Sequence, residues 1–253
     1  TRSEQTRANR GSKEASQRER RSRIEGRGRD DSPSKLDLLF YVEEARTARR
    51  GRRVRKGAAG SLLRMTELFG GAVLCSGIPS SWRDVSQIRQ CPDHQEVFQG
   101  CVEETGGVLL VFEVLQHQER VEDESAGAFF LSDLADSNRA AESSVVSGRV
   151  IKSLDDAVDV KDALPSLRIP DGFSGVACIS RGRQKVAQGK DGRNEARWID
   201  IHMCVLRLRC VETDFVISLS VPLGEESSAA QDSHEIFSEI LRGFKIIDWN
   251  LFG

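Results

Sequence analysis

The fold is decided by the stretch ARWIDIHMCVLRLRC at 196–210, which is followed after only three residues by DFVISLSVPL at 214–223. Both segments are rich in β-branched and other apolar residues, as strands are. Because the connection is so short, the two segments are predicted to pair as an antiparallel hairpin. Apolar side chains alternate up to Val205 and then change phase at Leu206, so a β-bulge is expected near 205–207.

Further extended and helical patterns surround this hairpin. VLLVFEVL at 108–115 is apolar in both alternation phases, which is typical of a central strand covered on both faces. Within 143–172, VVSGRVIKS is predicted as a strand, and the Asp- and Pro-containing remainder is expected to be a long loop or insertion. The other predicted strands are AVLCSGIP at 72–79, EVFQ at 96–99 and GVACISRGRQKVAQ at 175–188. Helices are predicted for SAGAFFLSDLADSNRAA from 125 and for HEIFSEILRGFKII at 234–247, with the alternative that Gly243 ends the second helix early and leaves FKII as a short extended tail.

The order of these elements predicts the fold class. Three strands, a helix, three further strands and a final helix do not alternate as βαβα units would, so the chain is predicted to be an α+β protein. We expect a twisted, mostly antiparallel sheet flanked by helices, in one domain at 65–253. The pattern starts directly after Met65, with TELFGG.

The first 64 residues have a different composition. They hold 19 basic and 9 acidic side chains, a net charge of +10, and few apolar residues before Leu36. Such a segment buries too little apolar surface to offset its ordering entropy, so residues 1–64 are predicted to be a disordered Arg-rich extension. An open alternative is that this extension does not belong to the natural protein. Its run RRGRRVRK at 49–56 could serve as a nuclear-localisation or nucleic-acid patch, or simply be a solvated basic tail.

The remainder of the chain is acidic and carries no recognisable catalytic motif. Residues 65–253 hold 18 basic and 30 acidic side chains, a net charge of −12. There is no phosphate-binding GxxxxGK[ST] motif, and the four histidines lie far apart without metal-ligand spacing, so no cofactor or metal is expected. The six cysteines form no CxxC pair and are interpreted as mostly buried thiols of a cytosolic or nuclear protein. No apolar run reaches the roughly 18 residues of a membrane span.

Two local features remain unexplained by a plain core. The string DVSQIRQCPDHQEVF at 84–98 begins with a possible short helix, DVSQIRQ at 84–90, with Asp84 as its N-cap and Val85 and Ile88 on one face. Pro92 prevents that helix from continuing, and Asp93 favours a turn after it. Glu113 is a charge inside the central apolar strand. These features indicate binding rather than catalysis.

Three pieces of the sequence together resemble the Ran guanine-nucleotide release factors, the Mog family. They are ELFGGAV at 67–73, DVSQIRQCPDHQEVF at 84–98 and GFKIIDWNLFG at 243–253, and the resemblance extends over about 66–253. It implies a fold similar to the PsbP oxygen-evolving subunit. It also implies a monomer in the nucleus and cytoplasm that binds the GTPase Ran, promotes release of its nucleotide and so influences nuclear protein import. The alternative is an adaptor or interaction module without release activity that binds nucleic acid through the basic extension.

The same resemblance suggests which residues face the partner. An acidic position that the family uses toward Ran matches Glu113, and a second one, three residues later, is Gln116 here, which removes a carboxylate. Glu113 could alternatively be a strand-end residue that only points to solvent. The other candidates for a partner-facing rim are Asp84, Arg89, Asp93, Gln95 and Glu96. A helix cap, a proline stop and an Arg89–Glu96 tie could equally make that string a scaffold.

Overall fold

The structure is a computed structural model. It describes residues 63–86, 91–102, 106–154, 157–187, 196–223 and 229–252. Contacts divide the chain into Thr1–Pro33 and Ser34–Gly253, and every described residue lies in the second unit. The basic patch at 49–56 and almost all of the extension therefore lie outside the described residues. The first strand begins at Leu63, two residues before the predicted start of the domain.

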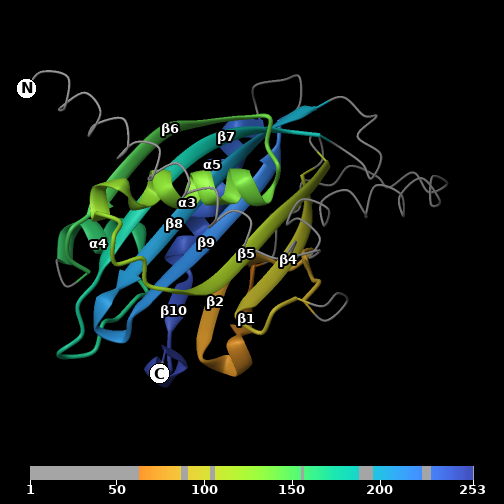
Figure 1. Cartoon of the computed structure of the whole chain (residues 1–253). Coiled ribbons are helices and arrows are strands. Elements are labelled where there is room, and N and C mark those ends of the chain that lie inside the picture. The colour runs from red at the N-terminus through yellow and green to blue at the C-terminus, as the bar shows by residue number, and fades with distance from the viewer. Residues whose placement is uncertain are drawn as a thin grey trace, which may run out of the picture. The chain divides into compact units, whose positions relative to one another are not determined.

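A large sheet dominates the described part of the chain, and all its neighbouring strands pair antiparallel (Figure 1). In spatial order its strands are β3 (Arg83–Asp84), β4 (Gln95–Val102), β5 (Gly106–Gln116), β9 (Thr213–Pro222), β8 (Arg197–Leu208), β7 (Val176–Val186) and β6 (Glu142–Ile151). The predicted hairpin is confirmed as β8 and β9, which are joined by the short 3-10 helix η2 (Arg209–Val211). The central position predicted for β5 is confirmed too.

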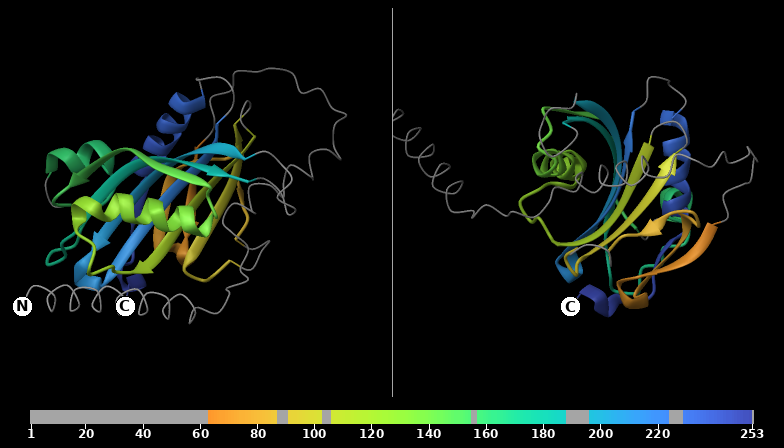
Figure 2. Two further views of the ribbon diagram at one scale, coloured as in Figure 1. Left: turned by 45° about the horizontal axis from the view of Figure 1, so that its top comes forward. Right: turned by 90° about the vertical axis from the view of Figure 1, so that its right-hand side faces the viewer.

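A smaller sheet and the helices cover the large one. The small sheet has the order β1 (Leu63–Leu68), β2 (Val73–Pro79) and β10 (Phe244–Ile246), with η1 (Phe69–Gly71) between its first two strands. The helices are α3 (Asp123–Ser137), α4 (Ala157–Ala163), α5 (Ala229–Arg242) and the C-terminal 3-10 helix η3 (Trp249–Phe252). Figure 2 shows α3 on one side of the large sheet, and α5 with the small sheet on the other. The α+β, mostly antiparallel fold class is therefore confirmed.

The central strands are buried on both faces, and this overturns the predicted β-bulge. The pairing of β8 with both neighbours runs without a register shift. Ile201, Met203 and Val205 belong to the core under α3, whereas Cys204 and Leu206 belong to the core under α5 and the small sheet. The change of apolar phase thus marks a strand with a core on each side rather than an extra residue. An irregularity does occur between Val145 and Ser147, on the edge strand β6.

Residues 143–172 are more regular than the sequence indicated. The strand β6 already begins at Glu142 and continues to Ile151. Part of the expected loop is the short helix α4, which packs on α5 and contributes Val160 and Ala163 to the larger core. Asp and Val are poor helix formers, so tertiary packing has overridden local propensity here. The strand β1 was also not predicted.

Gly77 is the position where the small sheet and α5 approach most closely. A Cβ atom added there would overlap the backbone of Glu239 and Ile240. Gly77→Ala is therefore expected to lower the free energy of unfolding by about 1–3 kcal/mol, the usual cost of overpacking. The control is Gly148→Ala in β6, where the nearest atom is 3.9 Å from the added Cβ. Urea denaturation of both variants checks this, and equal stabilities would show that α5 does not need the close approach.

Candidate partner-binding site

Several of the partner-binding residues predicted from the sequence lie at the end of the large sheet where β4 begins and β5 ends. A turn leads into β4, closed by the Gln95 amide donating to the Pro92 carbonyl at 2.9 Å. The Val114 amide donates to the His94 carbonyl, also at 2.9 Å, so the ladder continues into the turn. The turn predicted at Pro92 and Asp93 is confirmed, and both side chains are exposed.

Glu113 lies directly beside this turn. It is paired with Gln95 across the two strands, and the Gln95 side-chain amide donates to its carboxylate. The His94 Nε2 atom lies 4.0 Å from the same carboxylate oxygen, and the His94 side chain is half exposed. Glu113 itself is only 7% exposed, so it is not simply a strand-end residue turned to solvent. Its carboxylate orders the polar side chains that cover it.

Gln116 ends the same strand but has different surroundings. The regular pairing of β5 with β9 continues to Gln116, opposite Thr213. Residues three apart on a strand point to opposite faces of the sheet, so Glu113 and Gln116 do not share a face. Gln116 is exposed and belongs to the rim.

Glu96 is fully engaged inside the protein. One carboxylate oxygen accepts the Phe69 amide at 3.0 Å, and the other accepts the Ser86 hydroxyl at 3.2 Å. Phe69 has a φ of 50°, which is uncommon for a residue other than glycine, so Glu96 supports a strained corner between β1 and β2. The Ser86 hydroxyl in turn accepts the Val97 amide at 2.8 Å.

Asp84 also makes a local bond. Its side chain accepts the Ser86 amide at 2.9 Å, the interaction of a helix N-cap, while its backbone ends β3. The short helix predicted at 84–90 is not present in its described part, because Asp84 ends β3 and Val85 and Ser86 are not helical. Residues 87–90, with Arg89 and its predicted tie to Glu96, lie outside the described residues. The structure therefore brings Asp93, Gln95 and Glu113 together and leaves Gln116 on the adjacent rim.

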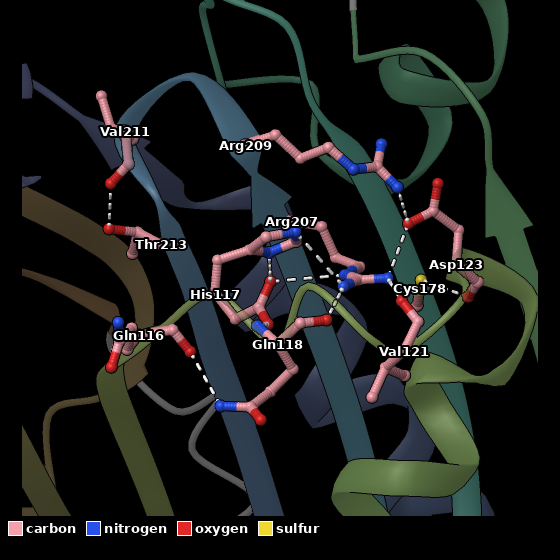
Figure 3. Close-up of polar contacts among 11 residues, drawn as sticks. Gln116, His117, Gln118, Val121, Asp123, Cys178, Arg207, Arg209, Val211 and Thr213 are labelled. Atoms are coloured by element: carbon pink, nitrogen blue, oxygen red, sulfur yellow. Dashed lines mark hydrogen bonds and ion pairs between the residues drawn. The ribbon is translucent and has the colours of Figure 1, made fainter.

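Sequence reasoning missed a buried polar network at this end of the sheet (Figure 3). Arg207 of β8 and Asp214 of β9 both have 0% exposed side chains, and their Nε and Oδ1 atoms lie 3.4 Å apart. Asp214 also accepts the Nδ1 hydrogen of His117, the residue directly after Gln116, at 2.8 Å. The signal that could have found the network is the one that singled out Glu113, a charge inside a strand apolar on both faces.

A hollow of about 590 Å³ lies next to this network. It is lined by the end of β5, the connection between β8 and β9, and the C-terminal helix η3. Its residues are Val114, Leu115, Gln116, Cys210, Val211, Glu212, Thr213, Leu251 and Phe252. The rim at Gln116 is thus partly apolar as well as polar.

A serine, a histidine and an aspartate meet elsewhere in the sheet, but not in the geometry of a hydrolase. The Nε2 atom of His202 is 3.0 Å from the Ser233 hydroxyl and also 3.3 Å from the Asp200 carboxylate. A catalytic triad uses the two ring nitrogens for two different partners. Ser233 is 1% exposed, so no substrate can reach it. This cluster is structural.

The remaining chemistry of the described residues offers neither a metal site nor a reactive buried thiol. No group of three or more potential ligands among them could hold a metal ion, and none of their helices could cross a membrane. Burial raises the pKa of Cys75 to about 11 and that of Cys178 to about 12, so both are neutral thiols near pH 7. The thiols of Cys75, Cys178 and Cys204 are buried as predicted, whereas Cys210 is exposed.

The described residues thus form an antiparallel α+β fold with buried and exposed polar side chains at one end of its large sheet. The family model described as Ran-interacting Mog1 protein matches residues 66–222. The chain therefore belongs to the Ran-interacting Mog1 family.

Curated relatives and a solved structure agree with this family. The Ran guanine nucleotide release factor of Danio rerio is 29% identical over 196 residues, covering 74% of this chain and 98% of that protein. The nuclear import protein mog1 of Schizosaccharomyces pombe is 33% identical over 176 residues, covering 68% and 84%. The crystal structure of the Saccharomyces cerevisiae Ran-binding protein Mog1p superposes with a TM-score of 0.53 at 22% identity, covering 77% of this chain and 100% of that one. This last likeness supports the fold.

The Asp200 cluster predicts a pH dependence of stability. Burial alone would raise the pKa of Asp200, but hydrogen bonds from His202 and Arg181 outweigh it, so the pKa lies below its ordinary value of 3.8. A depressed pKa contributes stability in full above the unfolded value, and the contribution is lost as the pH falls through the folded value. The free energy of unfolding should therefore fall between about pH 4 and pH 2 by less in Asp200→Asn than in the wild type. Denaturant titrations at each pH check this, and identical slopes would contradict it.

Proposed function

We propose that this protein binds the small GTPase Ran and promotes release of its guanine nucleotide, and that it influences nuclear protein import in this way. The observation that carries the proposal is the match to the Ran-interacting family, whose relatives in other organisms are named as release factors and nuclear import proteins. A protein with this role would work in the nucleus and the cytoplasm. It needs no catalytic residue of its own.

The proposed contact surface is the end of the sheet around Glu113. It includes the exposed side chains of Asp93 and His94, and His94 lies 4.0 Å from the carboxylate that Gln95 binds. Gln116 continues the surface along the rim. With a net charge of −12 on residues 65–253, this protein would attract a basic partner surface and associate faster at low salt.

Release follows from thermodynamic linkage rather than from bond chemistry. A protein that binds the nucleotide-free conformer of a GTPase more tightly than the nucleotide-bound one must weaken nucleotide binding by the same factor. A tenfold weakening requires about 1.4 kcal/mol of differential affinity, which one or two charge-assisted hydrogen bonds can supply. A fixed polar surface is therefore sufficient for the proposed function.

Replacement of Glu113 tests the centre of the surface. Glu113→Gln removes the negative charge beside His94 while keeping the shape, and is expected to slow release of a fluorescent guanine nucleotide from Ran about tenfold, the loss of one charged hydrogen bond. Glu142→Gln is the control, because it makes the same change on the edge strand β6, where the carboxylate is exposed and paired with Lys185. If Ran releases its nucleotide as fast with either folded variant as with the wild type, Glu113 has no part in the surface.

Replacement of Gln116 tests the same surface in the opposite direction, because it is expected to accelerate nucleotide release. Gln116→Glu restores a carboxylate on an exposed rim position, where a charged contact contributes about 0.5–1 kcal/mol. We therefore expect nucleotide release to be about two- to fivefold faster at low salt, with the difference shrinking as salt is added. Ser143→Glu on β6 adds the same charge far from the surface and should have no such effect. A rate that is unchanged, or equal in both variants, would place the contact elsewhere.

A further inference from the structure

Two buried charged side chains, Arg207 and Asp214, form hydrogen bonds to the connection between β5 and α3, residues 117–122. The Arg207 guanidinium donates to the carbonyl oxygens of Gln118, at 2.8 Å, and Val121 (Figure 3). It also donates to the carboxylate of Asp123 at 2.8 Å, where α3 begins. Asp123 is bound a second time by Arg209, at 2.7 Å. Both ends of the connection are thereby tied to β8.

Asp214 completes the attachment from β9. One carboxylate oxygen accepts the backbone amide of Gln118 at 2.9 Å, and the other accepts the Nδ1 hydrogen of His117 at 2.8 Å. Since a carboxylate only accepts, Nδ1 of His117 is the donor in this contact, and Nε2 lies 3.5 Å from the Arg207 Nη2 atom. The His117 amide donates to the Glu212 carbonyl at 2.8 Å. The connection therefore has little freedom.

The fold does not need a buried pair of charges at Arg207 and Asp214, although burying them costs free energy. Removing two charges from water is expensive, and a buried ion pair can often be replaced by apolar side chains without loss of stability. Yet Arg207 and Asp214 lie near the ends of the interior strands β8 and β9 with 0% exposed side chains. Apart from the contact between the two, their hydrogen bonds go to the connection itself, to the backbone of Gln118 and Val121 and the side chain of His117, and to Asp123 at the start of α3. What they supply is the position of that segment.

The segment so positioned presents exposed side chains next to the proposed contact surface. Gln116 precedes it, and Glu119, Arg120 and Glu122 are exposed along it. We propose that residues 116–122 are a preorganised contact segment for the GTPase, and that Arg207 and Asp214 are its positioning residues. This inference rests on the proposed function, since it assigns a second contact to the same surface. A segment ordered before binding avoids the entropy cost of ordering during binding.

The test compares two buried aspartates of the same sheet. Asp214→Asn replaces an acceptor of the connection with an amide, whereas Asp200→Asn weakens the buried contact with Arg181 in β7, away from the connection. With the full chain, hydrogen exchange of the amides of residues 117–122 and nucleotide release from Ran at increasing protein concentration are measured. Both are measured at a temperature where circular dichroism shows each variant folded. His117→Ala serves as the second variant if Asp214→Asn does not fold.

The expected result is specific to the connection. In Asp214→Asn, exchange of the Gln118 amide should accelerate at least tenfold, and the concentration for half-maximal release should rise about tenfold. Asp200→Asn should leave both within twofold. Unchanged exchange would overturn the positioning role, and faster exchange with unchanged release would overturn the contact role. Equal losses in both variants would reveal a general stability effect. If the wild type does not accelerate release, the proposed function fails and this inference fails with it.

Discussion

The burial of the central strands on both faces is the constraint on which the rest of this structure depends. The strands β5, β8 and β9 have one core under α3 and another under α5 and the small sheet. A charged side chain in such a strand has no access to water and must find its partners within the protein. Glu113, Arg207 and Asp214 all meet this requirement at the same end of the sheet.

This constraint links the core to the surface. The Glu113 carboxylate holds Gln95 under the exposed turn at Asp93, and the Arg207–Asp214 pair holds the connection that follows Gln116. Both are cases in which a buried charge fixes the backbone or side chains of an exposed segment. A regulator that acts by preferring one conformer of a GTPase requires a surface of fixed shape more than it requires reactive groups. In the proposed role, the segments fixed at this end of the sheet would supply such a surface.

Much of the fold could be predicted from the sequence because its signals are strong. The β8–β9 hairpin follows from two apolar segments joined by a very short connection, and the central place of β5 follows from its apolar residues in both phases. The predicted β-bulge was wrong because a change of phase has two explanations, and only the packing on the two faces of β8 distinguishes them. The helix α4 was missed because tertiary packing stabilises it against unfavourable local propensity.

The site could be predicted only in part. Glu113 was singled out because it breaks an apolar run. Arg207 breaks one in the same way, but it is 89 positions from its loop partner Gln118, so its role depends on the sheet order. That Gln116 and Glu113 lie on opposite faces of the sheet likewise becomes clear only from the register of β5.

The central claim is that this surface accelerates nucleotide release from Ran, and stopped-flow fluorescence with a labelled guanine nucleotide measures it directly. Our account predicts that the release rate rises with concentration of the wild-type protein and then saturates. A complex that forms without any change in the release rate would contradict it.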